Sequence, residues 1–118
     1  MRRIDPAATP ELYRKLGWKP KRGRFYEDKP TDCGCLVGAL YFDQHKRLPE
    51  PSRDWVGGNI GLDPVYVRGL INGFDGRYTN IDGGYERQEH RDLSIAGHAD
   101  GRAAWAALEA AGMVGNVQ

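Results

Sequence analysis

Two stretches in the second half of the chain decide the expected fold: residues 63–76, DPVYVRGLINGFDG, and residues 92–108, DLSIAGHADGRAAWAAL. Each has apolar residues at helical spacing, and each contains two glycines four positions apart. The four glycines are Gly69, Gly73, Gly97 and Gly101. A glycine inside a helix costs about 1 kcal/mol relative to alanine, so the four together cost about 4 kcal/mol. Small proteins are stable by only about 5–15 kcal/mol, so we expect another interaction to offset this cost.

Close contact between two helix backbones is the simplest such interaction. We therefore predict that helices over residues 64–74 and 93–111 pack together through their glycines. The alternative is that the first helix breaks at Gly73 and the second begins later, because Asn72 and Asp100 stand directly before the second glycine of each pair. The shared spacing is either a degenerate internal repeat or a coincidence in a glycine-rich chain.

Local capping signals set the other helix boundaries. Asp63, followed by a proline at the first helical position, predicts a helix start. Residues 77–91 are polar and predict a long surface loop, after which Asp92 is expected to cap the final helix. A short N-terminal helix is expected to begin with Thr9 as its cap, again followed by proline, and to end at Gly17.

One more helix is expected to begin at Cys33, capped by Thr31 or Asp32, and to end near Lys46. Apolar residues over 36–41 recur in the i, i+1, i+4, i+5 pattern of a buried helix face. We therefore expect this helix to be the centre of the core.

The expected fold is mainly α: a compact bundle of about four helices with long polar loops and at most a small β-hairpin near residues 24–28. A single domain is expected over residues 1–118. It divides into a basic segment over 1–30, a helical core over 31–112 and a frayed tail over 113–118.

The charges are unevenly distributed along the chain. Residues 1–30 carry nine basic and four acidic residues, a net charge of +5, whereas the remainder carries −4. These charges either pair within the fold, the interpretation we favour, or present a basic face to an anionic partner. The candidate partner-binding residues of this segment are Arg14, Trp18, Lys21, Arg22, Arg24 and Tyr26.

Mixed cations and aromatic rings over residues 14–29 also suggest a nucleic-acid-binding module. Cations would contact phosphates, and aromatic rings would stack on bases. The net charge of +1 for the whole chain does not favour this function. The alternative role of Trp18 and Phe25 is to anchor the core.

The sequence DCGC at residues 32–35 is the one place where we expect chemistry, if the protein is an enzyme. A thiol at a helix N-terminus has a lowered pKa and is a better nucleophile. A cysteine-dependent hydrolase or transferase would use Cys33, with His90 or His98 as the base. The alternative is structural, with Cys33 a half-exposed thiol and Cys35 a small core residue.

No metal or cofactor site is predicted. The two cysteines with His90 or His98 supply the ligand types of zinc, but they lack the tight spacing of a second ligand pair. The carboxylates lie at helix caps, in turns or beside glycines, where local capping accounts for them.

Several motifs follow one another in an order found in a known group of proteins. The pair GW at residues 17–18 precedes a basic-to-acidic segment, and the helix sequence CLVGAL follows at residues 35–40. The break FDG at residues 74–76 then precedes an alanine-rich helix with the pattern GxxDGxxA at residues 97–104. This order resembles small uncharacterised actinobacterial proteins, a domain-of-unknown-function family, and accessory proteins of actinobacterial phages. The resemblance implies no activity and no catalytic residues.

Binding is the function that remains. No stretch approaches the 18 or more apolar residues of a membrane span, and the N-terminus lacks a secretory signal, so we expect a cytoplasmic protein without a membrane partner. The sequence predicts a small intracellular protein that acts by binding another macromolecule, most simply a protein. If the chain is encoded by a phage, we expect it to be an accessory factor acting on a host protein.

Overall fold

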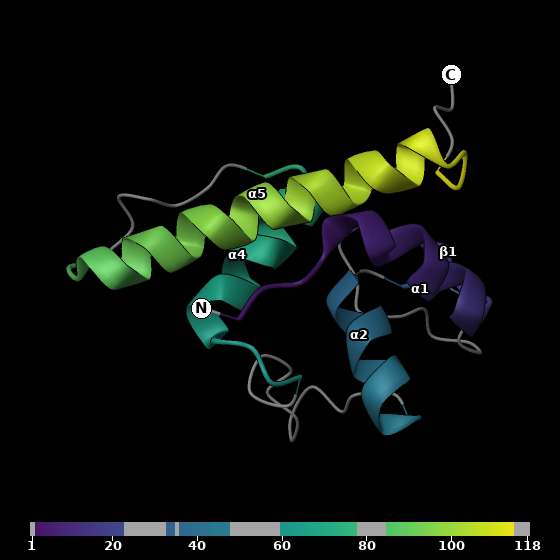
Figure 1. Cartoon of the computed structure of the whole chain (residues 1–118), viewed down its shortest axis with the longest axis horizontal. Helices are drawn as coiled ribbons and strands as arrows, with labels where there is room; N and C mark the ends of the chain where they lie inside the picture. Colours follow the sequence, from purple (N-terminus) through teal and green to yellow (C-terminus); the bar gives the residue numbers. More distant parts are fainter. Residues whose placement is uncertain (1, 23–32, 35, 48–59, 78–84, 115–118) are drawn as a thin grey trace.

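A computed structural model describes residues 2–22, 33–34, 36–47, 60–77 and 85–114. Within these residues the fold is mainly helical, which confirms the expected fold class (Figure 1). A 3-10 turn, η1, leads into the first α-helix. The elements are η1 (Pro6–Ala8), α1 (Thr9–Leu16), β1 (Lys19–Pro20), β2 (Cys33–Gly34), α2 (Leu36–His45), α4 (Pro64–Phe74) and α5 (Gln88–Ala110).

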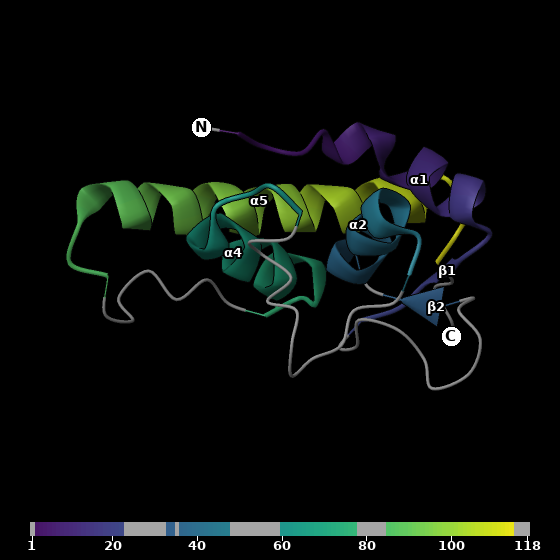
Figure 2. The ribbon, with the colours of Figure 1, turned by 90° about the horizontal axis from the view of Figure 1, so that it is seen from below.

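The two helices with paired glycines, α4 and α5, pack directly against each other, as the sequence predicted. They lie side by side in both views of the ribbon (Figures 1 and 2). All four glycines are buried, and none breaks its helix. A Cβ atom on any of them would overlap a backbone oxygen of the facing helix. The overlapping pairs are Gly69 with Ser94, Gly73 with His98, Gly97 with Tyr66, and Gly101 with Leu70.

The contacts between α4 and α5 advance in the same direction along both helices. Gly69 lies against residues 94–98, and Gly73 lies one turn further on, against residues 98–102. The two helices are therefore roughly parallel. Each glycine lacks a side chain at a point where the backbone of the facing helix comes into contact.

Capping residues define α4 as predicted, but the start of α5 differs from the prediction. Asp63 Oδ1 accepts a hydrogen bond from Val65 N at 2.8 Å, and a proline occupies the first turn of α4. In contrast, α5 begins at Gln88, four residues before the expected cap. Asp92 instead lies inside the helix and accepts a hydrogen bond from Gln88 Nε2 at 2.9 Å. Residues 88–91 are therefore helical rather than loop, because Gln, Glu and Arg are good helix formers.

The N-terminal helix begins within one residue of its predicted position. Asp5 rather than Thr9 provides the side-chain cap, since Asp5 Oδ1 accepts from Ala7 N at 3.1 Å and starts η1. Ala8 then stands at the N-cap of α1. Gly17 ends α1 in the left-handed conformation with φ of 70°, as predicted.

The prediction that a helix begins at Cys33 was wrong. Cys33 and Gly34 form β2, which pairs in parallel with Lys19 and Pro20 of β1, and α2 begins only at Leu36. Backbone pairing with β1 thus takes the place of the first helical turn. The expected hairpin near residues 24–28 lies outside the described residues.

A single cluster of buried side chains joins the helices. Its members are Tyr13, Trp18, Leu36, Val37, Ala39, Tyr41, Ile60, Tyr66, Val67, Leu70, Phe74, Ala104 and Leu108. Although α2 contributes its apolar face as predicted, it is not the central helix. It packs on α1 and α4, while the most extensive contact in the described residues joins α4 to α5. No helix in the described ranges has the length and apolar character to cross a bilayer.

Replacing Gly97 with alanine tests the close approach of α4 and α5. In an exposed helix the change would stabilise the protein by about 1 kcal/mol. Here the new methyl group would overlap the backbone at Tyr66, so we expect a net loss of about 1–3 kcal/mol, typical of overpacking. Chemical denaturation measures it. Ala103→Leu, on the exposed side of α5, is the control and should change stability by less than about 0.5 kcal/mol. Stabilisation by Gly97→Ala would contradict the packing.

Candidate binding site

The residues proposed for cysteine chemistry lie on two separate elements, Cys33 in β2 and both His90 and His98 in α5. Cys33 lies in β2 and not at the first residue of α2, which begins at Leu36. His90 belongs to the first turn of α5, at the opposite end of the molecule from β2 (Figure 2). Its ring contacts Tyr85, whereas His98 Nε2 lies 2.6 Å from the carbonyl oxygen of Arg77. Within the described residues, no three His, Cys, Asp or Glu side chains come together as metal ligands.

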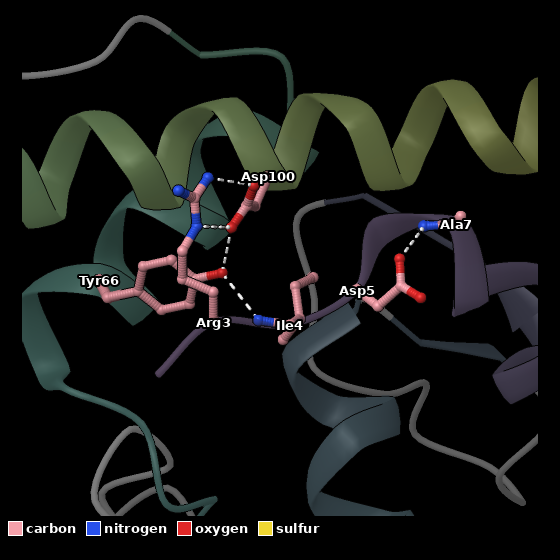
Figure 3. A network of polar contacts seen from close by, with 6 residues as sticks. All are labelled: Arg3, Ile4, Asp5, Ala7, Tyr66 and Asp100. Atoms are coloured by element: carbon pink, nitrogen blue, oxygen red, sulfur yellow. Dashed lines mark hydrogen bonds and ion pairs between the residues drawn. The ribbon is translucent and has the colours of Figure 1, made fainter. Parts of the chain in front are cut away.

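A polar network built on the buried Tyr66 and Asp100 joins the N-terminal segment to the helix pair (Figure 3). Arg3 binds Asp100 through two hydrogen bonds, Nε to Oδ2 at 2.9 Å and Nη2 to Oδ1 at 2.8 Å. The hydroxyl of Tyr66 also donates to Asp100 Oδ2, and it accepts from Ile4 N at 3.0 Å. The network therefore connects α4, α5 and the N-terminal segment.

Asp100 is only 6% exposed. Burial and hydrogen bonding shift the pKa of its carboxyl group in opposite directions. Burial by itself would raise the pKa of Asp100. The hydrogen bonds from Arg3 and Tyr66, together with the charge of Arg3, outweigh burial and hold this pKa below its ordinary value. Burial, followed by the hydrogen bond to Asp100, raises the pKa of Tyr66 to about 12, so its hydroxyl remains a donor at neutral pH.

Sequence reasoning missed this network because it assigned Asp100 to local capping. The available signal was helical spacing. If Gly97 and Gly101 face another helix, Asp100 lies close to the same face, and a carboxylate there requires a partner that donates hydrogen bonds. The identity of that partner, Arg3, does not follow from spacing, because it lies 97 positions away.

The N-terminal segment forms one wall of an apolar groove. The groove has a volume of about 300 Å³ and lies between this segment, α1, α2 and residues 60–62. Leu36 and Ile60 are buried in the core and form its floor. The walls are four partly buried aliphatic side chains, Ile4, Leu12, Leu40 and Leu62. Ala8 also lines the groove, and Arg2 and Gln44 lie at its edge.

A second feature is a set of exposed cations in the last turn of α1, at the start of β1 and directly after α2. We call Arg14, Lys15, Lys19, Lys46 and Arg47 the basic surface. Arg14 pairs with Glu11, and Lys15 and Lys46 both pair with Asp43. The hydrogen bond from Lys15 and the nearby lysine charges hold the pKa of Asp43 below its ordinary value.

The candidate partner-binding residues differ in their exposure and contacts. Arg14 and Lys21 are exposed, as a contact surface requires. Trp18 is a core residue with 4% exposure that packs on Phe42, so its assignment as a surface contact was wrong. Arg22 donates from Nε to the carbonyl of Phe74 at 2.7 Å and lies over the Trp105 ring. Arg24 and Tyr26 lie outside the described residues.

The favoured interpretation of the charge asymmetry holds for Arg3 and Lys15. Arg3 pairs with Asp100, and Lys15 pairs with Asp43 at 2.8 Å, so both join the segment to carboxylates from the rest of the chain. Arg14, by contrast, pairs within the segment, with Glu11.

Comparison of the chain with protein-family models, with curated proteins and with solved structures gives no match. The groove and the basic surface are therefore the features of the molecule that bear on a binding site.

Replacing Asp100 with asparagine tests the polar network and its pH dependence. At neutral pH the carboxylate is charged in both the folded and the unfolded chain. We expect the variant to lose about 1–3 kcal/mol of unfolding free energy there, as for hydrogen bonds to charged groups. As the pH falls below about 4, the unfolded chain takes up the proton first, and the advantage of the native aspartate disappears through its lower folded pKa. Urea unfolding at neutral pH and at pH values below about 4 measures the two differences.

Asp92→Asn is the matched control, because Asp92 is an exposed carboxylate on the same helix. We expect this variant to change stability by less than about 0.5 kcal/mol. A loss in Asp100→Asn that stays constant as the pH falls would contradict the assigned role of the carboxylate.

Proposed function

We propose that this protein acts by binding another protein through the basic surface. The observation that supports the proposal is that cations of α1, of β1 and of the residues after α2 are exposed, and that two of them meet at one carboxylate. Lys15 and Lys46 meet at Asp43, with Nζ to Oδ1 distances of 2.8 and 3.6 Å. The side chains of Arg14, Lys15 and Lys46 are 55%, 60% and 68% exposed. A surface of this kind fits an acidic patch on the partner.

A protein partner is better supported than a nucleic acid. Binding single strands needs aromatic rings on which bases can stack, and Trp18 of this segment is buried. The guanidinium group of Arg22 already donates a hydrogen bond to the carbonyl of Phe74 and lies over the Trp105 ring. The net charge of +1 also falls short of the basic excess typical of nucleic-acid-binding domains.

The site of action that we propose is the cytoplasm. The most specific form of the proposal is that the chain is a phage accessory factor that binds a host protein. The sequence resemblance supports this form, and the basic surface supports the binding step.

Charge reversal on the basic surface tests the proposal. The variant Arg14→Glu/Lys19→Glu changes two exposed cations, and Arg68→Glu/Arg102→Glu makes the same change in charge on exposed positions of α4 and α5. Each immobilised protein is incubated with extract of the native host, treated with nuclease, and its retained proteins are quantified by mass spectrometry. The candidate partner is then purified and titrated calorimetrically.

We expect the wild type and the Arg68/Arg102 variant to retain the same partner. We expect the Arg14/Lys19 variant to bind it at least tenfold more weakly, because like charges would then face each other. Equal affinity for all three proteins would contradict the role of the basic surface. Retention that nuclease abolishes would replace the proposal with nucleic-acid binding, and no retention above an unrelated protein would contradict partner binding.

A further inference from the structure

Residues 2–5 of the N-terminal segment belong to no helix or strand, and distant parts of the chain hold them in place. Arg3 binds Asp100, which lies 97 positions further along the sequence (Figure 3). Ile4 N donates at 3.0 Å to the hydroxyl of Tyr66, which lies 62 positions further along. These two residues therefore lie on the helix pair in the way that a short peptide ligand lies on a protein.

The helix pair forms the receiving site from its own residues. Tyr66 on α4 and Asp100 on α5 are 0% and 6% exposed, and the Tyr66 hydroxyl donates to Asp100 Oδ2. Arg3 supplies two of the three hydrogen bonds that the described residues make to this carboxylate. A buried carboxylate left with a single hydrogen bond is costly, so the site favours a cationic donor at the position of Arg3.

The contacts select an arginine and the peptide bond that follows it. Nε and Nη2 of the guanidinium bind the two oxygens of Asp100 separately, at 2.9 and 2.8 Å, a two-point geometry that a lysine ammonium does not reproduce. The Tyr66 hydroxyl accepts from the N–H of the next residue, which a proline would lack. The site therefore recognises an arginine that is followed by a residue other than proline.

The position of Arg3 at the surface makes it replaceable. Its side chain is 47% exposed, whereas the side chain of Asp100 is 9% exposed. The guanidinium thus covers the carboxylate on one side and faces solvent on the other. The helical part of the N-terminal region begins with η1, directly after Asp5, so only residues 2–5 have to move for the carboxylate to become accessible.

The surface that receives the preceding residue, Arg2, also suits a basic ligand. Arg2 lines a pocket of about 440 Å³ together with three carboxylates, those of Asp63, Glu89 and Asp92. Asp63 and Asp92 accept hydrogen bonds from uncharged donors and keep their charges, whereas Glu89 pairs with Arg87. Even with Arg87 counted, the carboxylates outnumber the cations here, which favours a positively charged segment.

We propose that Tyr66 and Asp100 form a recognition site for an arginine in a segment of another protein, and that Arg3 occupies this site in the free chain. The site shares no residue with the basic surface and takes a ligand of opposite charge, so the inference goes beyond the proposed function. Because Arg3 is tethered next to the site, its effective concentration is about millimolar, and an external arginine has to compete with it.

Emptying the site tests the inference. Arg3→Ala removes the internal ligand. Arg2→Ala is the matched control, because it removes the neighbouring arginine and leaves the site occupied. Arg3→Lys keeps the charge but loses the two-point contact. Thermal unfolding establishes that each variant folds, and if Arg3→Ala does not, the comparison of Arg3→Lys with the wild type decides in the same way.

The probe is the dipeptide acetyl-Arg-Ile-amide, titrated into each isotope-labelled protein while the amide signals of Tyr66 and Gly101 are followed by NMR. We expect Arg3→Ala to bind it about tenfold more tightly than the wild type, because the tethered competitor is gone. Arg3→Lys should have an intermediate affinity, and Arg2→Ala should match the wild type. Acetyl-Lys-Ile-amide and acetyl-Arg-Pro-amide should bind Arg3→Ala more weakly, because each lacks one of the two contacts.

Equal affinity of Arg3→Ala and the wild type for the dipeptide would overturn the inference, and so would equal affinity for the arginine and lysine dipeptides. Binding that leaves the signals of Tyr66 and Gly101 unchanged would place the dipeptide elsewhere and would also overturn it. Self-association of the wild type that Arg3→Ala abolishes and Arg2→Ala preserves would assign the site to a second copy of this chain, against the inference.

Discussion

The rest of the structure depends on the direct contact between the backbones of α4 and α5. Four glycines allow each helix to enter the space that side chains would otherwise fill, and a Cβ atom at any of them would overlap the facing backbone. Dispersion contacts over this surface offset the conformational cost of placing glycine in helices. The pair in turn positions Tyr66 and Asp100 within hydrogen-bonding distance of each other. A local sequence feature thus determines where a long-range network forms.

The network fixes the position of the N-terminal segment relative to the helix pair. Arg3 and Ile4 are held by Asp100 and Tyr66, and the segment they belong to forms one wall of the groove (Figure 3). The position of the groove wall therefore depends on the helix pair through Arg3 and Ile4. The two hydrogen bonds between Arg3 and Asp100 are charge-assisted and therefore stronger than neutral ones, although the Arg3 side chain is 47% exposed.

Features encoded by neighbouring residues could be predicted from the sequence, and features encoded by distant ones could not. Asp63 and its following proline located the start of α4, and the glycine spacing predicted its partner helix. The start of α5 was missed because Gln88 begins a polar turn without a side-chain cap, which resembles a loop. The assignment of Cys33 to a helix failed because pairing with β1 competes with helix formation. The groove requires four segments to be placed in space, and no local pattern encodes that arrangement.

The most direct measurement of the central claim is the set of nuclear Overhauser effects between glycine Hα protons of α4 and backbone protons of α5. The account predicts strong effects from Gly69 to residues 94–98 and from Gly73 to residues 98–102, together with effects from Gly97 to Tyr66 and Leu70. Helical chemical shifts over both segments without these effects would show two helices held apart by side chains. That result would contradict the close backbone contact.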